Sequence, residues 1–130
     1  MKLFETNLFS FEHDEAGKIL EFLWTEETAE MTADDFKDGL TRFTEHIEKH
    51  GITGALVDLR TFRFPMTKDL GPWRDEAIVP RYNASQLVRF AYLVPAGFSA
   101  PEPGYQAPGE DFETRFFESE SEARAWLTVA

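Results

Sequence analysis

Two short hydrophobic runs, separated by a long polar stretch, constrain the fold of this chain most strongly. ALVDLR begins at Ala55, and RFAYLV ends at Val94. Short apolar runs bounded by turn-forming residues are typical of strands that are buried on both faces. The residues between them, 61–86, suffice for the helical crossover that parallel strands require. We therefore predict parallel strands over 55–59 and 90–94, with any ligand beyond their carboxyl ends.

Composition indicates one folded domain over residues 1–130. The chain is 42% hydrophobic, with 13 Phe and 3 Trp, which is enough to build a core. It contains no cysteine, which excludes disulfides, thiolate metal sites and cysteine nucleophiles. The chain start lacks the apolar core and cleavage site of a secretory signal. No hydrophobic run approaches the roughly 18 residues needed to span a membrane. We therefore expect a soluble, cytoplasmic protein.

Charge is distributed unevenly. The net charge of −11 argues against a nucleic-acid partner, because phosphates would be repelled. Residues 60–89 nevertheless carry a net charge of +3, since three acids accompany six cations, namely Arg60, Arg63, Lys68, Arg74, Arg81 and Arg89. This basic segment either attracts an anion or balances the charge of its surroundings.

Periodicity and capping signals predict the elements before the crossover. Residues 3–11 and 18–25 alternate in polarity around a turn at 12–17, which predicts an N-terminal β-hairpin. A helix is expected to begin after Thr32, whose hydroxyl can cap the first turn, and to end at Gly51. One face of this helix carries a hydrophobic stripe that should pack on the sheet, consisting of Phe36, Leu40, Phe43 and Ile47.

The crossover helix is interrupted by proline. Thr67 can cap a helix, and Gly71-Pro72 either precedes a helix over 72–79 or bends one over 67–79, with Pro80 ending either version. We expect the core-facing residues to be Leu70, Trp73 and Ala77, and the solvent-facing residues to be Arg74, Asp75 and Glu76.

The C-terminal part begins with a segment, 95–111, that has four prolines and three glycines. Such a segment is either a functional lid or a mobile connection, in which Phe98 and Tyr105 are possible anchors. A strand over 113–117 and a helix over 119–128 follow. Ser119 and Glu122 form a capping box at the start of that helix, and its buried stripe is predicted to be Ala123, Trp126 and Leu127.

Four stretches resemble the SpoIIAA-like proteins, relatives of the STAS (anti-sigma-factor antagonist) domain that are also likened to lipid-binding CRAL-TRIO domains. They are GALVDLR (54–60), WRDEAIVPRYNA (73–84), RFAYLVP (89–95) and RFFESESEARAWL (115–127). The resemblance implies a single α/β domain, with an N-terminal β-hairpin, a mostly parallel sheet of about four to five strands and flanking helices. It also implies a regulator or binder that is not an enzyme and needs no cofactor.

The chain departs from the STAS pattern in two places. STAS antagonists carry a phosphorylatable serine near the start of the crossover helix, whereas residues 58–67 contain no serine. Thr67 is the only hydroxyl residue in a comparable position at the helix start, and its context does not match. The segment 95–111 also stands where the family usually places another helix.

The end of the first buried strand and the crossover carry the candidate binding site. Asp58 ends that strand, and Arg60 and Arg63 can hold it charged in a structural role. Alternatively, the arginines gather around an anion, because guanidinium groups bind carboxylate or phosphate in two-point geometry. The predicted ligand-binding residues are Asp58, Arg60, Phe62, Arg63, Phe64, Trp73, Arg74 and Arg81.

Two classes of function follow. The first is a regulatory, non-enzymatic module that recognises a protein partner or an amphiphilic or anionic small molecule near residues 58–82. The second is an enzyme that uses Asp58 as acid or base, with Arg74 or Arg81 holding an anionic substrate. A homodimer formed through the edge of the N-terminal hairpin and peripheral contact with a membrane stay open. His46 and His50 have a metal-ligand spacing, but they lie at a helix end that favours histidine for its charge, so we expect no metal.

Overall fold

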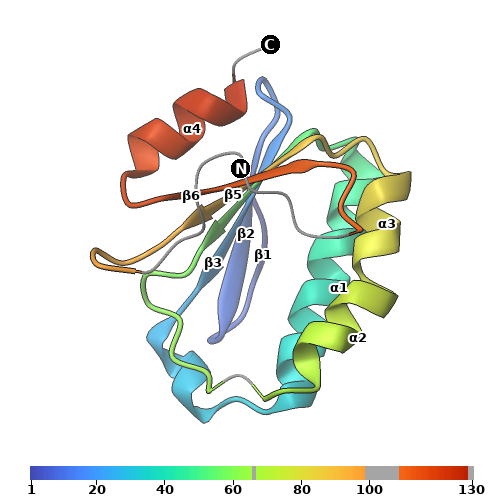
Figure 1. Ribbon diagram of the computed structural model, residues 1–130. Coiled ribbons are helices and arrows are strands. Elements are labelled where there is room, and N and C mark those ends of the chain that lie inside the picture. Colours follow the sequence, from blue (N-terminus) through green and yellow to red (C-terminus); the bar gives the residue numbers. More distant parts are fainter. Residues whose placement is uncertain (66, 99–108, 129–130) are drawn as a thin grey trace.

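A computed structural model describes residues 1–65, 67–98 and 109–128 (Figure 1). The elements in chain order are β1 (Lys2–Glu5), β2 (Phe9–Asp14), β3 (Ile19–Trp24), the 3-10 helix η1 (Glu26–Glu30), α1 (Ala33–His50), β4 (Gly54–Asp58), α2 (Leu70–Ala77), α3 (Val79–Ala84), β5 (Arg89–Leu93), β6 (Glu113–Phe117) and α4 (Glu120–Thr128).

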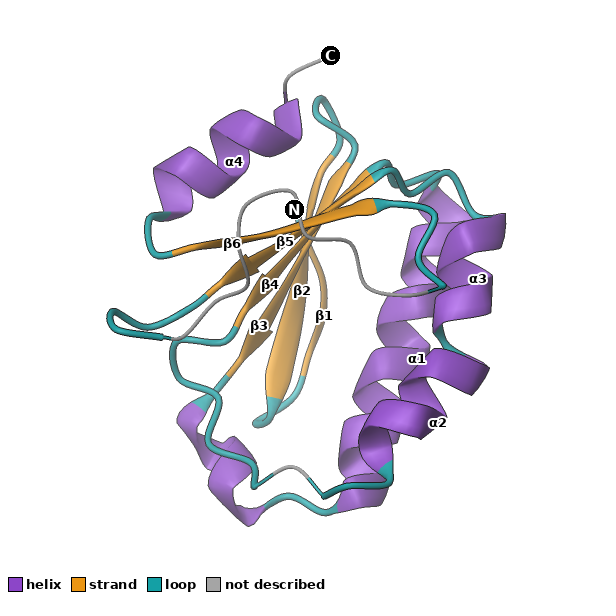
Figure 2. Cartoon of the chain, viewed as in Figure 1, coloured by secondary structure: helices purple, strands orange, loops and turns teal. Residues whose placement is uncertain are grey.

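The strands form one mixed sheet of six strands in chain order, β1 to β6 (Figure 2). β1, β2 and β3 pair antiparallel, and β3, β4, β5 and β6 pair parallel. The two hydrophobic runs are β4 and β5, which are parallel neighbours in the register Val57 to Tyr92. The predicted α/β fold with a parallel strand–helix–strand unit is therefore confirmed.

The N-terminal prediction needs two corrections, the first of which is that residues 3–11 contribute to two strands and not one. Thr6 breaks the run: its hydroxyl oxygen accepts hydrogen bonds from the amides of Leu8 (3.1 Å) and Phe9 (3.2 Å). Threonine side chains stabilise turns in this way, at the expense of continued strand pairing. The sheet consequently has one strand more than expected. The β2–β3 turn, at residues 15–18, also lies later than the predicted 12–17.

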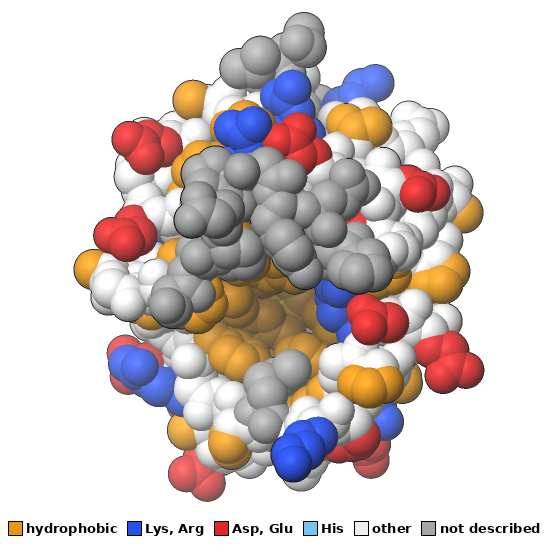
Figure 3. Space-filling view, viewed as in Figure 1, with side chains coloured by type: hydrophobic (Ala, Val, Ile, Leu, Met, Phe, Trp, Pro, Cys, Tyr) orange, Lys and Arg blue, Asp and Glu red, His pale blue; other side chains and the backbone are white. Residues whose placement is uncertain are grey.

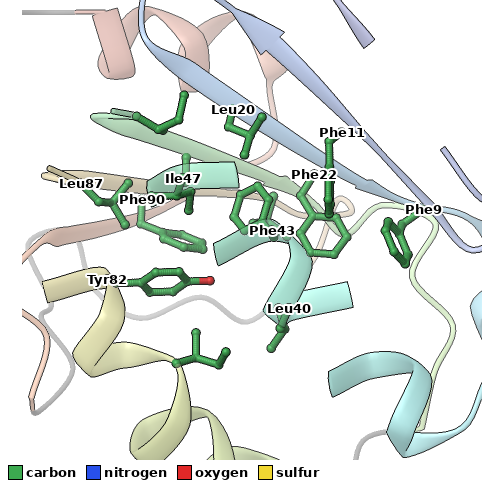
Figure 4. Packing of buried hydrophobic residues seen from close by; sticks show 14 of the residues in the cluster. Phe9, Phe11, Leu20, Phe22, Leu40, Phe43, Ile47, Tyr82, Leu87 and Phe90 are labelled. Atoms are coloured by element: carbon green, nitrogen blue, oxygen red, sulfur yellow. The ribbon is translucent and has the colours of Figure 1, made fainter. Parts of the chain in front are cut away.

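Helices cover both faces of the sheet. α1, α2 and α3 lie on one face and α4 lies on the other (Figures 1 and 2). Because side chains alternate along a strand, each strand contributes to two cores. In β4, Ala55 and Val57 belong to the large core under α1–α3, whereas Leu56 belongs to the smaller core under α4. Figure 4 shows the large core, where rings from the sheet meet side chains of α1 and α3.

The predicted bounds of α1 are confirmed. Thr32 accepts a hydrogen bond from the amide of Asp35 (3.2 Å), and the Asp35 carboxylate accepts one from the amide of Thr32 (3.0 Å), which completes a capping box. Gly51 ends the helix in the left-handed conformation, with φ of 62°. The four residues of the predicted stripe are all buried.

The crossover contains two helices where one was predicted. Pro72 lies in the first turn of α2 and Pro80 in the first turn of α3, where backbone amides have no intrahelical acceptor to lose. Pro80 therefore belongs to a new helix, and the junction falls at Ile78. The position before α2 is occupied by Asp69 and not by Thr67, whose hydroxyl instead donates to the Asp69 carboxylate (2.6 Å).

The helix face predicted for the crossover is also partly wrong. Leu70 is buried and Trp73 is half-buried, as expected, but Ala77 is exposed. Arg74 was expected to face water, and its side chain is only 21% exposed. The reason is a buried carboxylate, Glu110, that the helix pattern alone could not show.

The C-terminal elements follow their predictions. β6 spans the predicted residues, and the hydroxyl of Ser119 accepts a hydrogen bond from the amide of Glu122 (3.4 Å) at the start of α4. Ala123 and Leu127 are buried, whereas Trp126 is half-buried. Of the segment 95–111, Phe98 stacks on Phe116 at 6.0 Å between ring centroids. Tyr105 lies outside the described residues.

Candidate ligand pocket

An apolar pocket of about 200 Å³ lies between the sheet and helices α1–α3, at the carboxyl ends of β3, β4 and β5. Figure 3 shows a hollow lined by hydrophobic side chains on this face of the molecule. The lining includes Trp24, Val57, Leu59, Phe62, Phe90 and Tyr92. This is the place where open α/β sheets usually bind their ligands.

Strand alternation supplies the pocket wall, and the loop after β4 supplies its rim. Val57 faces α1, because side chains alternate along β4 and those of Ala55 and Val57 point to that side of the sheet. Leu59 and Phe62 follow in the loop, which two hydrogen bonds hold in place. The hydroxyl of Thr61 donates to the carbonyl of Trp24 (2.6 Å), and the amide of Arg63 donates to the hydroxyl of the buried Thr28 (2.7 Å).

Arg74 is the cation in the pocket wall. Two of its guanidinium nitrogens lie 3.3 Å from Glu110 Oε2, and Nη2 lies 3.5 Å from the Tyr92 hydroxyl. The Glu110 side chain is 4% exposed, and its other oxygen accepts a hydrogen bond from the Thr114 hydroxyl (3.0 Å). Tyr92 is the main influence that raises the pKa of Arg74, so this guanidinium stays charged.

Tyr82 contributes a wholly buried hydroxyl to the same wall. Figure 4 shows this hydroxyl directed toward Leu40, another residue of the lining. It makes no well-formed hydrogen bond within the described part of the chain, although an interaction with the Thr44 side chain of α1 works against the rise in its pKa. Burial is the main cause that raises the pKa of Tyr82, which keeps the phenol protonated. A buried hydroxyl without a well-formed hydrogen bond is uncommon, because its desolvation is then uncompensated.

Asp58 does not face this pocket. Its Oδ1 accepts hydrogen bonds from the Arg60 amide (3.0 Å) and Nε (3.1 Å), and its Oδ2 accepts one from Nη2 (2.8 Å). Arg60 continues to Glu120 of α4, at 3.4 Å. The predicted structural pairing with Arg60 is therefore confirmed. Because both oxygens are engaged and the side chain is 5% exposed, the geometry counts against a role for Asp58 as acid or base.

The other predicted binding residues do not converge. Phe62 and Arg74 line the pocket, and Phe64 stacks on Phe36 at 5.9 Å beside it. The remaining residues lie apart: Arg63 is exposed, Trp73 packs under Lys37 at 5.5 Å, and Arg81 binds Glu48 of α1 at 2.6 and 3.0 Å.

The expected cluster of arginines around one anion is therefore wrong as a geometric arrangement. Arg60, Arg74 and Arg81 each bind a carboxylate, and those carboxylates come from different parts of the fold. The pairing of Arg60 with the nearby Asp58 was one of the two alternatives, whereas the partners of Arg74 and Arg81, Glu110 and Glu48, are remote in sequence and were not foreseen.

Eight of the ten lining residues were absent from the predicted binding residues, among them Tyr82 and Tyr92. Glu110, which binds Arg74 without lining the pocket, was also missed. Tyr92 was accessible in principle, because it pairs in register with Val57 and so points to the same face. Glu110 carried no such signal, since it lies in a segment rich in proline and glycine.

No metal site is evident in the part of the chain that the structure describes, where no group of three or more His, Asp or Glu side chains is arranged to hold an ion. The three histidines do meet: His50 lies 4.9 Å from His13 and 5.8 Å from His46, measured between ring centroids. Within the described residues, no helix is both long enough and apolar enough to cross a membrane.

The mixed sheet, the helical crossovers and the apolar pocket at the strand ends define a single-sheet α/β domain. The chain belongs to the SpoIIAA-like family, whose sequence model matches residues 19–128. The family resemblance is thereby confirmed, over a range that begins at β3. No curated protein and no solved structure matched the chain. Membership of this family indicates a regulatory STAS-like module, of a kind that commonly interacts with proteins and is generally not enzymatic.

Proposed function

We propose that this protein is a regulatory STAS-like module that binds a small, mostly apolar molecule in the pocket. We further propose that a protein partner recognises the surface around its mouth. One observation carries the proposal, namely the apolar pocket at the carboxyl ends of β3, β4 and β5. Protein interiors normally contain few voids larger than a water molecule. An apolar recess of about 200 Å³ therefore supports a role in ligand binding.

A line of aromatic rings offers a route from the pocket to a partner. Tyr92 in the wall stacks on Phe116 at 5.1 Å, and Phe116 stacks on Phe98 at 6.0 Å. Phe98 is 45% exposed, so its ring is available for contact with a partner. A partner that covers Phe98 would therefore sense the position of Tyr92, and through it the occupancy of the pocket.

The anionic ligand expected from the sequence finds less support than an apolar one. Three of the four arginines that could have attracted it, namely Arg60, Arg74 and Arg81, already bind carboxylates. Phe62 and Arg74 remain proposed ligand contacts, because both line the pocket. Asp58 and Arg60 are proposed instead to stabilise the turn after β4.

The test is a thermal-shift screen with fatty acids, lipids, nucleotides and small ring compounds. The variant Leu59→Trp places a larger side chain in the pocket rim, and the double variant Arg60→Ala with Arg63→Ala serves as the control. We expect Leu59→Trp to abolish the ligand-induced shift and the control to retain it. A shift that survives in Leu59→Trp but disappears in the double variant would move the site to the arginines and overturn the proposal.

A further inference from the structure

We propose that the pocket selects an uncharged, ring-sized molecule that carries a carbonyl oxygen. This inference rests on the proposed function, since it assumes that the pocket binds a ligand. It adds the chemical class of that ligand, which follows from the size of the pocket, from the charge balance at Arg74, and from the hydrogen-bond donors in the wall.

The size of the pocket favours one ring. A cavity of about 150 Å³ in an engineered protein stays dry and binds benzene, whereas pockets for drug-sized ligands start at roughly 300 Å³. The present pocket, about 200 Å³, falls between these values. It can therefore hold a single ring with a short substituent, and it is too small for a long acyl chain.

The charge balance disfavours an anion. Arg74 and Glu110 form a pair with little exposure, 21% and 4% of their side chains, and the exposed Asp75 lies 3.9 Å from Arg74 Nη1, so the positive charge at this edge of the pocket is already balanced. A carboxylate ligand would add a further charge to an environment where desolvation is costly. A carboxylate bound to the remaining guanidinium N–H groups would lie beside Glu110, so that two carboxylates would share one cation and repel each other. A neutral ligand avoids both penalties.

The donors in the wall favour a carbonyl group. The Tyr92 hydroxyl accepts a hydrogen bond from Arg74, and a phenol that accepts in this way still has its own proton to donate. The described residues show no acceptor for that proton. Arg74 has five N–H donors, of which the contacts with Glu110 and Tyr92 use only part. A carbonyl oxygen at the edge of the pocket would accept from Tyr92, with Arg74 as its neighbour.

The experiment compares three probes of similar shape by calorimetric titration of the wild-type protein. They are acetophenone, which is neutral with a carbonyl, ethylbenzene, which is neutral without one, and benzoate, which is anionic. We expect acetophenone to bind roughly ten-fold more tightly than ethylbenzene, the typical effect of one hydrogen bond. Benzoate is expected to bind most weakly.

Two variants test whether Tyr92 and Glu110 cause these differences in affinity among the probes. In Tyr92→Phe, acetophenone and ethylbenzene should bind equally, because the donor is gone. In Glu110→Gln, which preserves the shape of the side chain, benzoate binding should rise at least ten-fold because Arg74 is no longer neutralised. The wild-type ranking alone tests the charge claim if either variant fails to fold.

The outcomes separate this inference from the proposed function. Benzoate binding to the wild type as tightly as acetophenone, or equal binding of the two neutral probes, would overturn the inference and leave a ring-binding pocket in place. Failure of all three ring compounds to bind would overturn the inference, while the fatty-acid, lipid and nucleotide arms of the thermal-shift screen would still decide the proposed function.

Discussion

Val57 and Asp58 are consecutive residues of β4, yet their side chains lie on opposite faces of the sheet. Val57 lines the pocket beneath α1–α3, whereas Asp58 binds Arg60, which reaches Glu120 of α4. The pleat of the strand imposes this separation, because successive side chains point to opposite sides. The carboxyl end of β4 therefore contributes to two different environments, of which one is an apolar pocket and the other is an ion-pair network that is partly exposed to solvent.

The position of Asp58 predicts a structural role that is independent of ligand binding. Asp58→Ala removes the acceptor for the Arg60 amide and leaves that group unsatisfied, so we expect a loss of about 1–3 kcal/mol in the free energy of unfolding. Urea denaturation measures this loss, and the affinity of the pocket should stay unchanged. Asp58→Asn keeps an acceptor oxygen and should cost less. An unaltered stability together with a lost ligand response would reverse this assignment.

We predict that replacing Gly39 by alanine has an unusual effect on the stability of the protein. Gly39 lies in the middle of α1, where alanine normally stabilises a helix by about 1 kcal/mol relative to glycine. A Cβ at this position would lie 2.8 Å from Cη2 of Trp24 and 3.3 Å from Cε2 of Phe9. Gly39→Ala should therefore destabilise the protein by about 1–3 kcal/mol through overpacking.

The matched control for that substitution is Gly71→Ala in α2. A Cβ there would meet no atom within 4 Å. This variant should be neutral or should stabilise the protein by up to about 1 kcal/mol. Parallel thermal unfolding of the two variants is sufficient, and opposite signs are expected. Equal gains at both positions would mean that Trp24 yields easily to the added methyl group.

We predict that the buried hydroxyl of Tyr82 is dispensable for the stability of the fold. This hydroxyl has no well-formed hydrogen bond within the described residues, and its remaining side-chain interaction is with Thr44, so Tyr82→Phe removes a desolvated polar group at little cost. We expect the free energy of unfolding to stay constant or to rise by up to about 1 kcal/mol. Urea denaturation of the wild type and the variant checks this. A loss above about 1.5 kcal/mol would indicate that the hydroxyl is hydrogen-bonded in solution.

The histidine cluster predicts a loss of stability on mild acidification. Burial lowers the pKa of His46 below its ordinary value of 6.5, and His50 and Lys49 add to this effect. The pKa of His50 is lowered in the same way by burial, His13 and Lys49. Arg42 also lowers the pKa of His46, whereas Glu45 opposes the shift at His46 and Glu15 opposes it at His50.

The direction of this change in stability with pH follows from proton linkage. Between the folded-state pKa and the ordinary value of 6.5, the unfolded chain binds more protons than the folded one, so stability falls as the pH decreases through this window. Urea denaturation at about pH 7.5 and about pH 5.5 avoids the range in which most carboxylates titrate. The double variant His46→Gln with His50→Gln should respond less to pH. An identical slope in both proteins would assign the effect to other groups.

Local patterns were sufficient for most elements of the fold. Apolar runs at β4 and β5 predicted a parallel pair, and the cap signals Thr32 and Gly51 gave the ends of α1 correctly. These features are encoded by residues close together in sequence. The two failures, at Thr6 and at Pro80, occur where one residue type serves two structures: threonine suits both strand and turn, and proline both ends and begins helices.

The candidate site was predictable only in part. Its general position, at the carboxyl end of β4, followed from the fold class, and Phe62 and Arg74 line the pocket that lies there. Asp58 was grouped with these residues, but it follows Val57, which lines the pocket. Its side chain therefore points to the opposite face of the sheet, because consecutive residues of a strand alternate in direction. The arginine cluster does not form, because Arg74 and Arg81 bind carboxylates that are distant in the chain, Glu110 and Glu48.

The sequence by itself determined the α/β class, the parallel pairing of the two hydrophobic runs and the bounds of α1, since each depends on periodicity and on residues a few positions apart. The tertiary structure alone decided which side chains meet at the pocket and which charges cancel. Those outcomes depend on contacts between residues that are distant in the chain, such as Arg74 and Glu110, and local patterns carry no information about which distant groups come together.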